Sequence, residues 1–137
     1  MQLTIKWLHL SVNGETCPRC SETGKELLKA LEILRRILST LNIEVVFEEL
    51  ELIPEDFSQN PLRSNEIWIN DRLLEDWLGA KTTQTPCCDV CGDQKCRALE
   101  IGQEIQEVVT AELIMRAALN AVVEMRTSCC SEDYCCG

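Results

Sequence analysis

The chain has 137 residues, 13 of them basic and 23 acidic, so its formal net charge is −10 at pH 7. That length suits one domain with a hydrophobic core, and the apolar fraction of 45% is typical of globular proteins. The negative charge disfavours nucleic acid and anionic lipid as partners, and no apolar run reaches the roughly 18 residues that a membrane span requires.

Ten cysteines dominate the chemistry that this sequence offers. The first ten residues carry Lys6 and His9 among their apolar residues and contain no small-residue cleavage site, so they do not indicate a signal peptide. We therefore expect a cytoplasmic protein. In a reducing compartment, many cysteines indicate metal binding or redox catalysis rather than structural disulfides.

The first predicted elements are a strand over residues 3–10 and a long amphipathic helix behind the first cysteine pair. The strand is indicated by apolar residues at alternate positions. The start of the helix lies either at Pro18 or at a capping box over residues 23–26, and we favour the earlier start. Its apolar face consists of leucines at three- and four-residue steps: Leu27, Leu31, Leu34, Leu38 and Leu41.

Shorter elements follow. We predict strands over residues 43–47 and 66–70, with a loop or short irregular helix over 53–64 between them. A short amphipathic helix over residues 72–78 is predicted to stop at Gly79.

The last third of the chain alternates between cysteine-rich and regular segments. Residues 81–95 show little periodicity and are predicted to form a loop organised by its cysteines. A hairpin around Gly102 is expected to join residues 97–101 to 104–108, and Thr110 is predicted to cap a last helix that ends near Met125.

A dithiol, Cys17-Pro18-Arg19-Cys20, lies at the predicted start of the long helix. Backbone N–H groups and the helix dipole stabilise a thiolate at this position, and Arg19 can add to the effect. We predict Cys17 as the nucleophile and Cys20 as the thiol that resolves a mixed disulfide. The alternatives are half of a zinc site or a pair of ordinary thiols.

The order of elements around Cys17 and Cys20 resembles the thioredoxin superfamily. The resemblance implies an α/β thioredoxin-like domain over residues 1–126, with a cysteine-rich insert at about 79–96 between the third and fourth strands. A flexible cysteine-rich tail over residues 127–137 would follow. Thioredoxin-like proteins usually place a cis-proline before the third strand, facing the dithiol, whereas this chain has Ser64-Asn65 there.

A more specific resemblance covers most of the chain. It is carried by three runs, Ser64-Asn65-Glu66-Ile67-Trp68-Ile69-Asn70, Leu74-Glu75-Asp76-Trp77-Leu78, and Cys87-Cys88 through Cys96-Arg97. They look like those of a little-characterised prokaryotic family of cysteine-rich, thioredoxin-like proteins. That family implies a fold but no mechanism.

The second cysteine group consists of Cys87, Cys88, Cys91 and Cys96. The Cys88-x-x-Cys91 spacing is that of a metal knuckle, and Cys96 is near enough to supply a third thiolate. Zinc and an iron–sulfur cluster each require four ligands, whereas three thiolates suit a soft ion such as arsenic or mercury. The alternative is a structural disulfide within the insert.

The third group is the tail, with adjacent pairs at Cys129-Cys130 and Cys135-Cys136. A mobile arm of soft ligands suits the capture and transfer of a metal(loid). The tail resembles the paired-cysteine tails of arsenical metallochaperones, which implies a role in metal(loid) delivery. The alternative is a disordered tail whose thiols are close only by chance.

His9 is the single histidine and lies in the strand that leads to the dithiol. It could help to ionise Cys17, or it could be a partly buried residue with a satisfied hydrogen bond. The acidic run over residues 47–56 is predicted to be a solvated face.

Two functions follow from the cysteines. The first is thiol–disulfide exchange with a protein disulfide at Cys17 and Cys20. The second is binding or delivery of a soft metal(loid), in which the dithiol contributes ligands or reduces the cargo. Neither function requires nucleic acid or a membrane.

Overall fold

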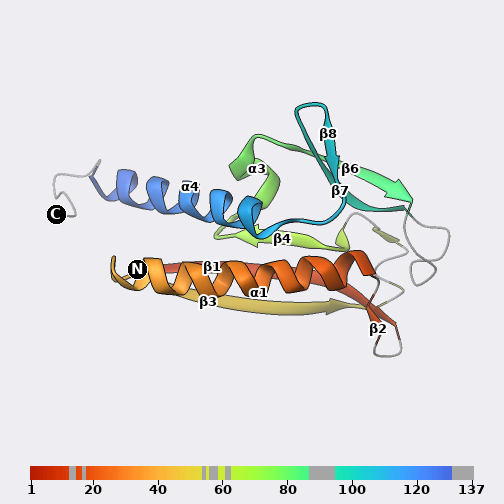
Figure 1. Ribbon diagram of the computed structural model, residues 1–137, viewed down its shortest axis with the longest axis horizontal. Coiled ribbons are helices and arrows are strands. Elements are labelled where there is room, and N and C mark those ends of the chain that lie inside the picture. Colours follow the sequence, from red (N-terminus) through yellow and green to blue (C-terminus); the bar gives the residue numbers. More distant parts are fainter. Residues whose placement is uncertain are drawn as a thin grey trace.

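The computed structural model describes residues 1–12, 15–16, 18–53, 55, 59–60, 63–86 and 95–130. Among these residues, two β-sheets and three helices form (Figure 1). Half of the irregular segment predicted over residues 53–64 lies outside the described residues, at 54, 56–58 and 61–62.

The first three long elements, in the predicted order of strand, helix and strand, form a parallel βαβ unit. Strand β1 (Gln2–Val12) leads to helix α1 (Pro18–Ser39), and strand β3 (Glu44–Leu52) pairs parallel to β1. The predicted leucine face of α1 is buried up to Leu38. Leu41 lies beyond the end of the helix and is 40% exposed, so the predicted face is one residue too long.

The main sheet is mixed and has the strand order β3-β1-β4-β5. Strand β4 (Glu66–Ile69) pairs antiparallel with β1, and the two-residue strand β5 (Arg72–Leu73) pairs antiparallel with β4. The short strand β2 (Glu15–Thr16) pairs with the end of β1.

The helix predicted over residues 72–78 begins later than expected, because its first two residues form β5. Helix α3 (Leu74–Leu78) ends at Gly79, which has the left-handed φ of 66° that glycine adopts without steric cost.

A second, antiparallel sheet follows α3 in the chain. It has the order β6-β7-β8, with β6 (Lys81–Pro86), β7 (Lys95–Ile101) and β8 (Glu104–Gln106). The predicted hairpin around Gly102 is confirmed, but residues 81–86 are a strand and not the expected loop. The fourth strand of the main sheet is β5, so the segment 79–96 follows that strand and does not precede it as predicted.

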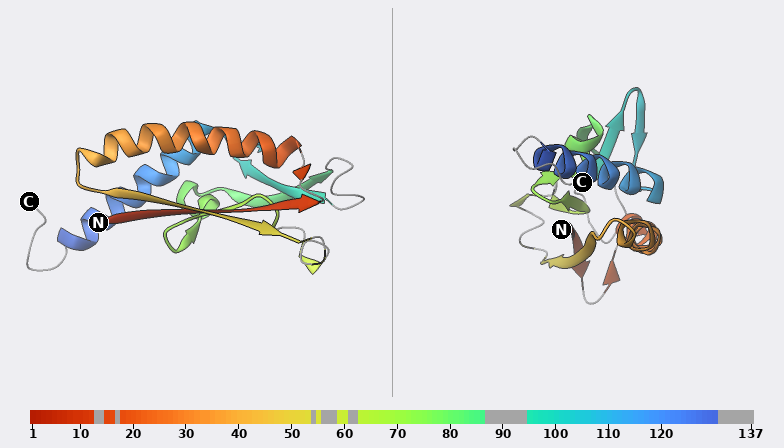
Figure 2. Two further views of the ribbon diagram at one scale, coloured as in Figure 1. Left: turned by 90° about the horizontal axis from the view of Figure 1, so that it is seen from below. Right: turned by 90° about the vertical axis from the view of Figure 1, so that its left-hand side faces the viewer.

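The last helix, α4 (Ala111–Cys130), packs against α1 and contacts the main sheet (Figure 2). The hydroxyl of Thr110 accepts a hydrogen bond from the N–H of Leu113 at 3.3 Å, so the predicted cap is confirmed. The helix continues five residues beyond the predicted end at Met125. No helix in the described parts of the chain is both long and apolar enough to cross a membrane.

One hydrophobic core joins these layers. The alternate residues Leu3, Ile5 and Trp7 of β1 are buried against α1 and α4, as the period of two predicts. The core includes two of the predicted site residues, Cys20 and Cys96, each 1% exposed.

Candidate functional site

The first turn of α1 carries the second thiol of the dithiol. The helix begins at Pro18, the residue after Cys17, so the earlier of the two predicted starts is confirmed. The Cys20 sulfur is buried and lies 3.6 Å from the Ser64 hydroxyl. Cys17 itself lies outside the described residues.

The segment before β4 faces this turn and carries Asn65, for which the predicted thioredoxin-like fold would have a cis-proline. Asn65 is buried with a φ of 63°, which a proline ring cannot adopt. Its side-chain oxygen accepts a hydrogen bond from Trp7 Nε1 at 2.9 Å, and its amide donates to Thr23 Oγ1 at 3.0 Å. No cis peptide bond occurs among the described residues. The asparagine side chain therefore ties the segment to both β1 and α1.

Arg19 links the dithiol turn to the second sheet. Its guanidinium donates to the carbonyl oxygens of Pro86, at 2.9 Å, and Arg97, at 3.1 Å, and forms an ion pair with Glu107. Thr85 also donates to the Glu107 carboxylate, at 2.6 Å. Because Pro86 ends β6 and Arg97 lies near the start of β7, both ends of the cysteine-bearing segment 87–94 are held beside the start of α1.

Arg19 was predicted to favour a thiolate by its charge. The structure gives the guanidinium a carboxylate partner, Glu107, and its side chain is only 9% exposed. Its main observed contacts are therefore those that hold the second sheet in place.

Cys96 belongs to this arrangement. It lies on β7 opposite Thr85 and is buried in the same core as Cys20. The other three members of the predicted second group, Cys87, Cys88 and Cys91, lie outside the described residues. Among the residues that are described, no three metal-ligating side chains converge.

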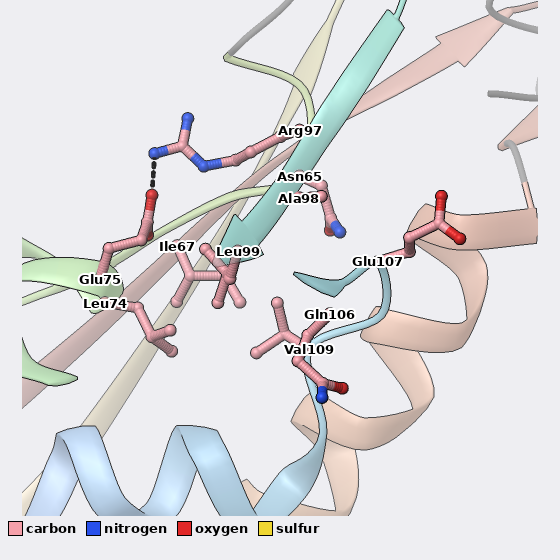
Figure 3. Close-up of a pocket in the computed structure, with 10 residues that line it drawn as sticks. All are labelled: Asn65, Ile67, Leu74, Glu75, Arg97, Ala98, Leu99, Gln106, Glu107 and Val109. Atoms are coloured by element: carbon pink, nitrogen blue, oxygen red, sulfur yellow. Dashed lines mark hydrogen bonds and ion pairs between the residues drawn. The ribbon is translucent and has the colours of Figure 1, made fainter. Parts of the chain in front are cut away.

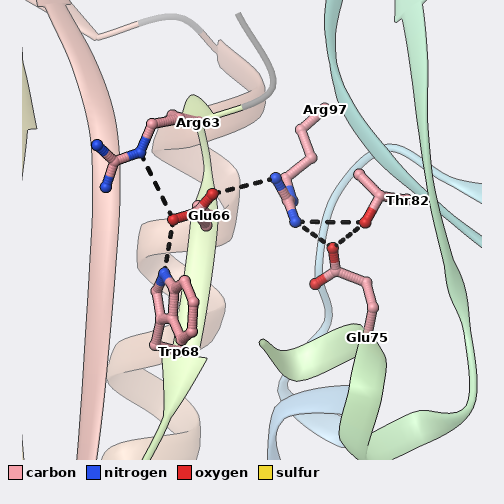
Figure 4. A network of polar contacts seen from close by, with 6 residues as sticks. All are labelled: Arg63, Glu66, Trp68, Glu75, Thr82 and Arg97. Carbon is pink, nitrogen blue, oxygen red and sulfur yellow. Dashed lines mark hydrogen bonds and ion pairs between the residues drawn. The ribbon is translucent and has the colours of Figure 1, made fainter. Parts of the chain in front are cut away.

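A buried charge network lies next to this junction, and nothing in the sequence pattern indicates it. Arg97 is 5% exposed and forms ion pairs with Glu66, at 3.4 Å, and with Glu75 (Figure 4). Thr82 donates to the Glu75 carboxylate at 2.5 Å. The network joins β4 of the main sheet to α3 and the second sheet, and removing one member of such a network leaves a buried charge uncompensated.

The cavity between the network and the Asn65 segment is too small for a substrate. Its volume is about 10 Å³, which is room for about one water molecule. Figure 3 shows Arg97 and Glu75 on one side of it and Glu107 on the other.

Helix α4 leads away from the dithiol turn towards the opposite end of the molecule. Helix α4 starts beside α1, where the N–H of Ala111 donates to Glu26 at 3.4 Å, and its 20 residues extend for about 30 Å. Its last two residues, Cys129 and Cys130, end at the side of the molecule away from the start of α1 (Figure 1). Cys135 and Cys136 lie outside the described residues, as do the side chains of Cys129 and Cys130.

His9 is buried, and Glu49 on β3 lies 2.8 Å from its Nε2. The predicted satisfied hydrogen bond is thus present at one ring nitrogen. The sequence predicts that Glu49 lies on a solvated acidic face. Its side chain is indeed 51% exposed, but its carboxylate also pairs with His9. The signal that could have found the pair is the strand period, because Glu49 falls on the same side of β3 as the core residue Val45 and the partly buried Phe47.

Comparison with known proteins gives two matches. The model of a family described as "Domain of unknown function (DUF2703)" matches residues 3–118. An uncharacterized protein of Archaeoglobus fulgidus is 75% identical over 114 residues, which cover 83% of each chain. No solved structure matches the chain. The family match includes the dithiol, the insert and the first part of α4, and it ends before the tail.

Proposed function

The chain belongs to the DUF2703 family, and we propose that its dithiol, Cys17 and Cys20, carries out thiol–disulfide exchange with a protein disulfide. The observation that carries the proposal is the position of Cys20, buried in the first turn of α1 and 3.6 Å from Ser64 on the facing segment. A buried second thiol suits the residue that resolves a mixed disulfide, because substrate has no access to it directly.

The strand arrangement supports a thioredoxin-like fold. Parallel β1 and β3 joined by α1, followed by antiparallel β4 and β5 and a helix packed beside α1, is the order and direction of a thioredoxin-like core. The second sheet is then an addition after β5. A shared topology does not determine a function. The proposed function therefore rests on the dithiol and not on the fold.

The reaction would proceed in two exchanges. The Cys17 thiolate attacks one sulfur of the substrate disulfide, and the other substrate sulfur leaves with the electron pair. Cys20 then attacks the Cys17 sulfur, which releases the second substrate thiol and leaves a Cys17–Cys20 disulfide. Two electrons pass to the substrate, and a dithiol reductant must restore the enzyme, as expected in the cytoplasm.

An insulin-reduction assay tests this function. The reduced wild-type protein is expected to reduce insulin disulfides, and Cys17→Ser and Cys20→Ser are expected to abolish turnover. Cys17→Ser should also trap no mixed disulfide, whereas Cys20→Ser should accumulate one, because only the resolving thiol is missing. A wild-type protein without activity would contradict the proposal.

A second candidate function, binding or delivery of a soft metal(loid), is favoured by the Arg19 contacts. They bring both ends of the segment that carries Cys87, Cys88 and Cys91 to the dithiol turn, near buried Cys96. A set of thiolates suits zinc, an iron–sulfur cluster, arsenic or mercury. Anaerobic purification with elemental analysis and an absorption spectrum separates these, and Cys91→Ser should lower the bound amount. Protein that holds no metal and takes up neither zinc nor arsenite would exclude this function.

A further inference from the structure

A groove with apolar walls lies where the end of α3, the end of β7 and the outer side of α4 meet. Its volume of about 390 Å³ falls within the range of about 300–1,000 Å³ that is usual for small-molecule sites. The residues that line it all belong to the described part of the chain: Leu78, Ile101, Leu113, Arg116, Leu119 and Asn120. Its apolar side chains are all aliphatic.

Contacts within the protein hold the walls of this groove. Asn120 on α4 donates a hydrogen bond from its side-chain amide to the carbonyl oxygen of Trp77 on α3, at 2.9 Å. Helix α3 thus lies beside α4 (Figure 1), and Leu78 is its last residue. Leu113 belongs to the hydrophobic core, so this part of the groove is backed by packed side chains. A preformed groove loses little conformational entropy when a ligand binds.

The groove leaves apolar side chains in contact with water. Leu119 is 40% exposed, and Leu78 and Ile101 are partly exposed. A single exposed leucine is ordinary, but these three side chains come from three different elements and line one groove. Apolar walls combined with a few polar groups are typical of a ligand site.

Arg116 is the charged residue that lines the groove, and among the described residues no carboxylate pairs with it. Glu112 lies one turn earlier on α4. The same spacing separates Glu32 from Arg36 on α1, and those two side chains do pair, at 2.9 Å. The spacing thus permits an ion pair that Arg116 does not make. Because a guanidinium stays protonated in proteins, the groove carries an uncompensated positive charge.

We propose that this groove binds a small carboxylic acid with an aliphatic chain, in its ionised form. The chain lies on Leu78, Ile101 and Leu119, and the carboxylate accepts hydrogen bonds from the Arg116 guanidinium. The site is distinct from the dithiol, and it does not depend on the thiol–disulfide exchange proposed above.

The charge of the groove selects among apolar ligands. An aliphatic amine would bring a second cation to Arg116, and an aliphatic alcohol would leave the guanidinium without a counter-charge. A second copy of this chain is disfavoured as the occupant, because two molecules with a formal net charge of −10 repel each other.

Titration of the wild-type protein with octanoate tests the site, with the methyl NMR signals of Ile101, Leu113 and Leu119 as the readout. We expect saturable shifts at these residues. Hexanoate should bind about 10-fold more weakly, because two fewer methylene groups are buried. Octan-1-ol and octylamine should each bind about 5-fold or more weakly than octanoate. No saturable shift up to about 20 mM octanoate, or equal affinity for octanoate and octan-1-ol, would overturn the proposal.

Arg116→Gln tests the carboxylate contact. It should lower the affinity for octanoate by about 5-fold and leave that for octan-1-ol unchanged. The matched control is Arg35→Gln, which removes the same charge from an exposed position on α1 and should change neither affinity. Wild-type affinity for octanoate in Arg116→Gln would overturn the proposal.

Leu119→Asn tests the aliphatic wall and should weaken octanoate and octan-1-ol alike, by about 5-fold. Its control is Val123→Asn, on the same helix, 63% exposed and outside the groove. Both positions are exposed, so both variants should fold, and urea denaturation checks this. Equal affinities in the two variants would overturn the placement of the chain in this groove. So would a wild-type dimer in sedimentation that Leu119→Asn dissociates, because a second copy would then fill the groove.

Discussion

Arg19 joins the dithiol turn to the second sheet, so replacing it should lower the stability of the folded protein. Arg19→Gln removes the ion pair with Glu107 and the bonds to two carbonyl oxygens. We expect a loss of about 1.5–3 kcal/mol in the free energy of unfolding, measured by urea denaturation. The matched control is Arg36→Gln on the same helix, whose pair with Glu32 is exposed and should cost less than about 0.5 kcal/mol. Equal losses in the two variants would contradict the role of Arg19.

Asn65 combines a left-handed backbone with two buried hydrogen bonds, and a second asparagine separates these contributions. Asn42 has nearly the same φ, 60°, but is exposed in the turn between α1 and β3. Both Asn→Ala variants carry the left-handed cost, but Asn65→Ala also leaves Trp7 Nε1 without an acceptor. Asn65→Ala is therefore expected to be about 2–4 kcal/mol more destabilising than Asn42→Ala by urea denaturation. A similar loss for both would show that the Asn65 side chain contributes nothing beyond its backbone.

Part of the site could be read at the level of single residues. The position of the dithiol at the start of a helix could be predicted, because proline is favoured at the first position of a helix and Pro18 follows Cys17. Helix α1 does begin at Pro18. The Arg19 bond to the Arg97 carbonyl joins residues 78 positions apart, and the bond between Trp7 and Asn65 joins residues 58 apart. No local pattern encodes contacts across such separations, so the site's supports could not be predicted from one sequence.

At the scale of elements, the spacing of apolar residues predicts which side chains of β1 and α1 are buried on one face of the main sheet. The alternation in β1 and the leucine steps in α1 are both set by burial against the common core. Strand β6 was missed because its residues, Lys-Thr-Thr-Gln-Thr-Pro, contain no large apolar side chain, and it forms by pairing with β7. Three threonines in five residues were the available signal, since β-branched residues favour strands.

The contact between α1 and α4 contains a pH-dependent element. Glu26 on α1 accepts from Lys29 at 2.8 Å and from the N–H of Ala111, the first residue of α4. The hydrogen bond from Lys29, and after it the one from Ala111, lowers the pKa of Glu26 from its usual 4.5. A carboxyl group with a lowered pKa in the folded state adds stability above its unfolded value and loses it as the pH falls through the folded value.

Glu26→Gln should therefore be less stable than wild type at neutral pH, and the difference should vanish in acid. Urea denaturation midpoints measured from about pH 7 down to about pH 3 check this. Glu32→Gln, in the same helix but paired only with exposed Arg36, is the matched control and should show a smaller difference at neutral pH. A gap between Glu26→Gln and wild type that stays constant over this range would exclude the carboxylate as its source.

At the scale of the whole molecule, the described residues next to the three cysteine groups lie at two locations. The start of α1 is held against both ends of the segment 87–94 by Arg19, whereas Cys129 and Cys130 end a helix of about 30 Å that leads away from it. The sequence alone does not show that Cys129 and Cys130 lie far from the dithiol turn. Their distance from it depends on α4, which continues past its predicted end at Met125. The family match stops at residue 118, within α4 and before the tail cysteines.

The tail and the dithiol should therefore act independently within one molecule. Beyond α4, residues 131–137 extend at most about 25 Å, which is less than the length of α4 that separates them from the dithiol end. Replacing Cys129, Cys130, Cys135 and Cys136 together by serine is expected to lower arsenite uptake and to leave insulin reduction within about 2-fold of wild type. Cys17→Ser with Cys20→Ser should give the opposite result, since it abolishes reduction and leaves the tail thiols in place. Loss of insulin reduction in the variant with the four serines would contradict this independence. If the rate per molecule also depended on protein concentration, the tail would act on the dithiol of a second molecule.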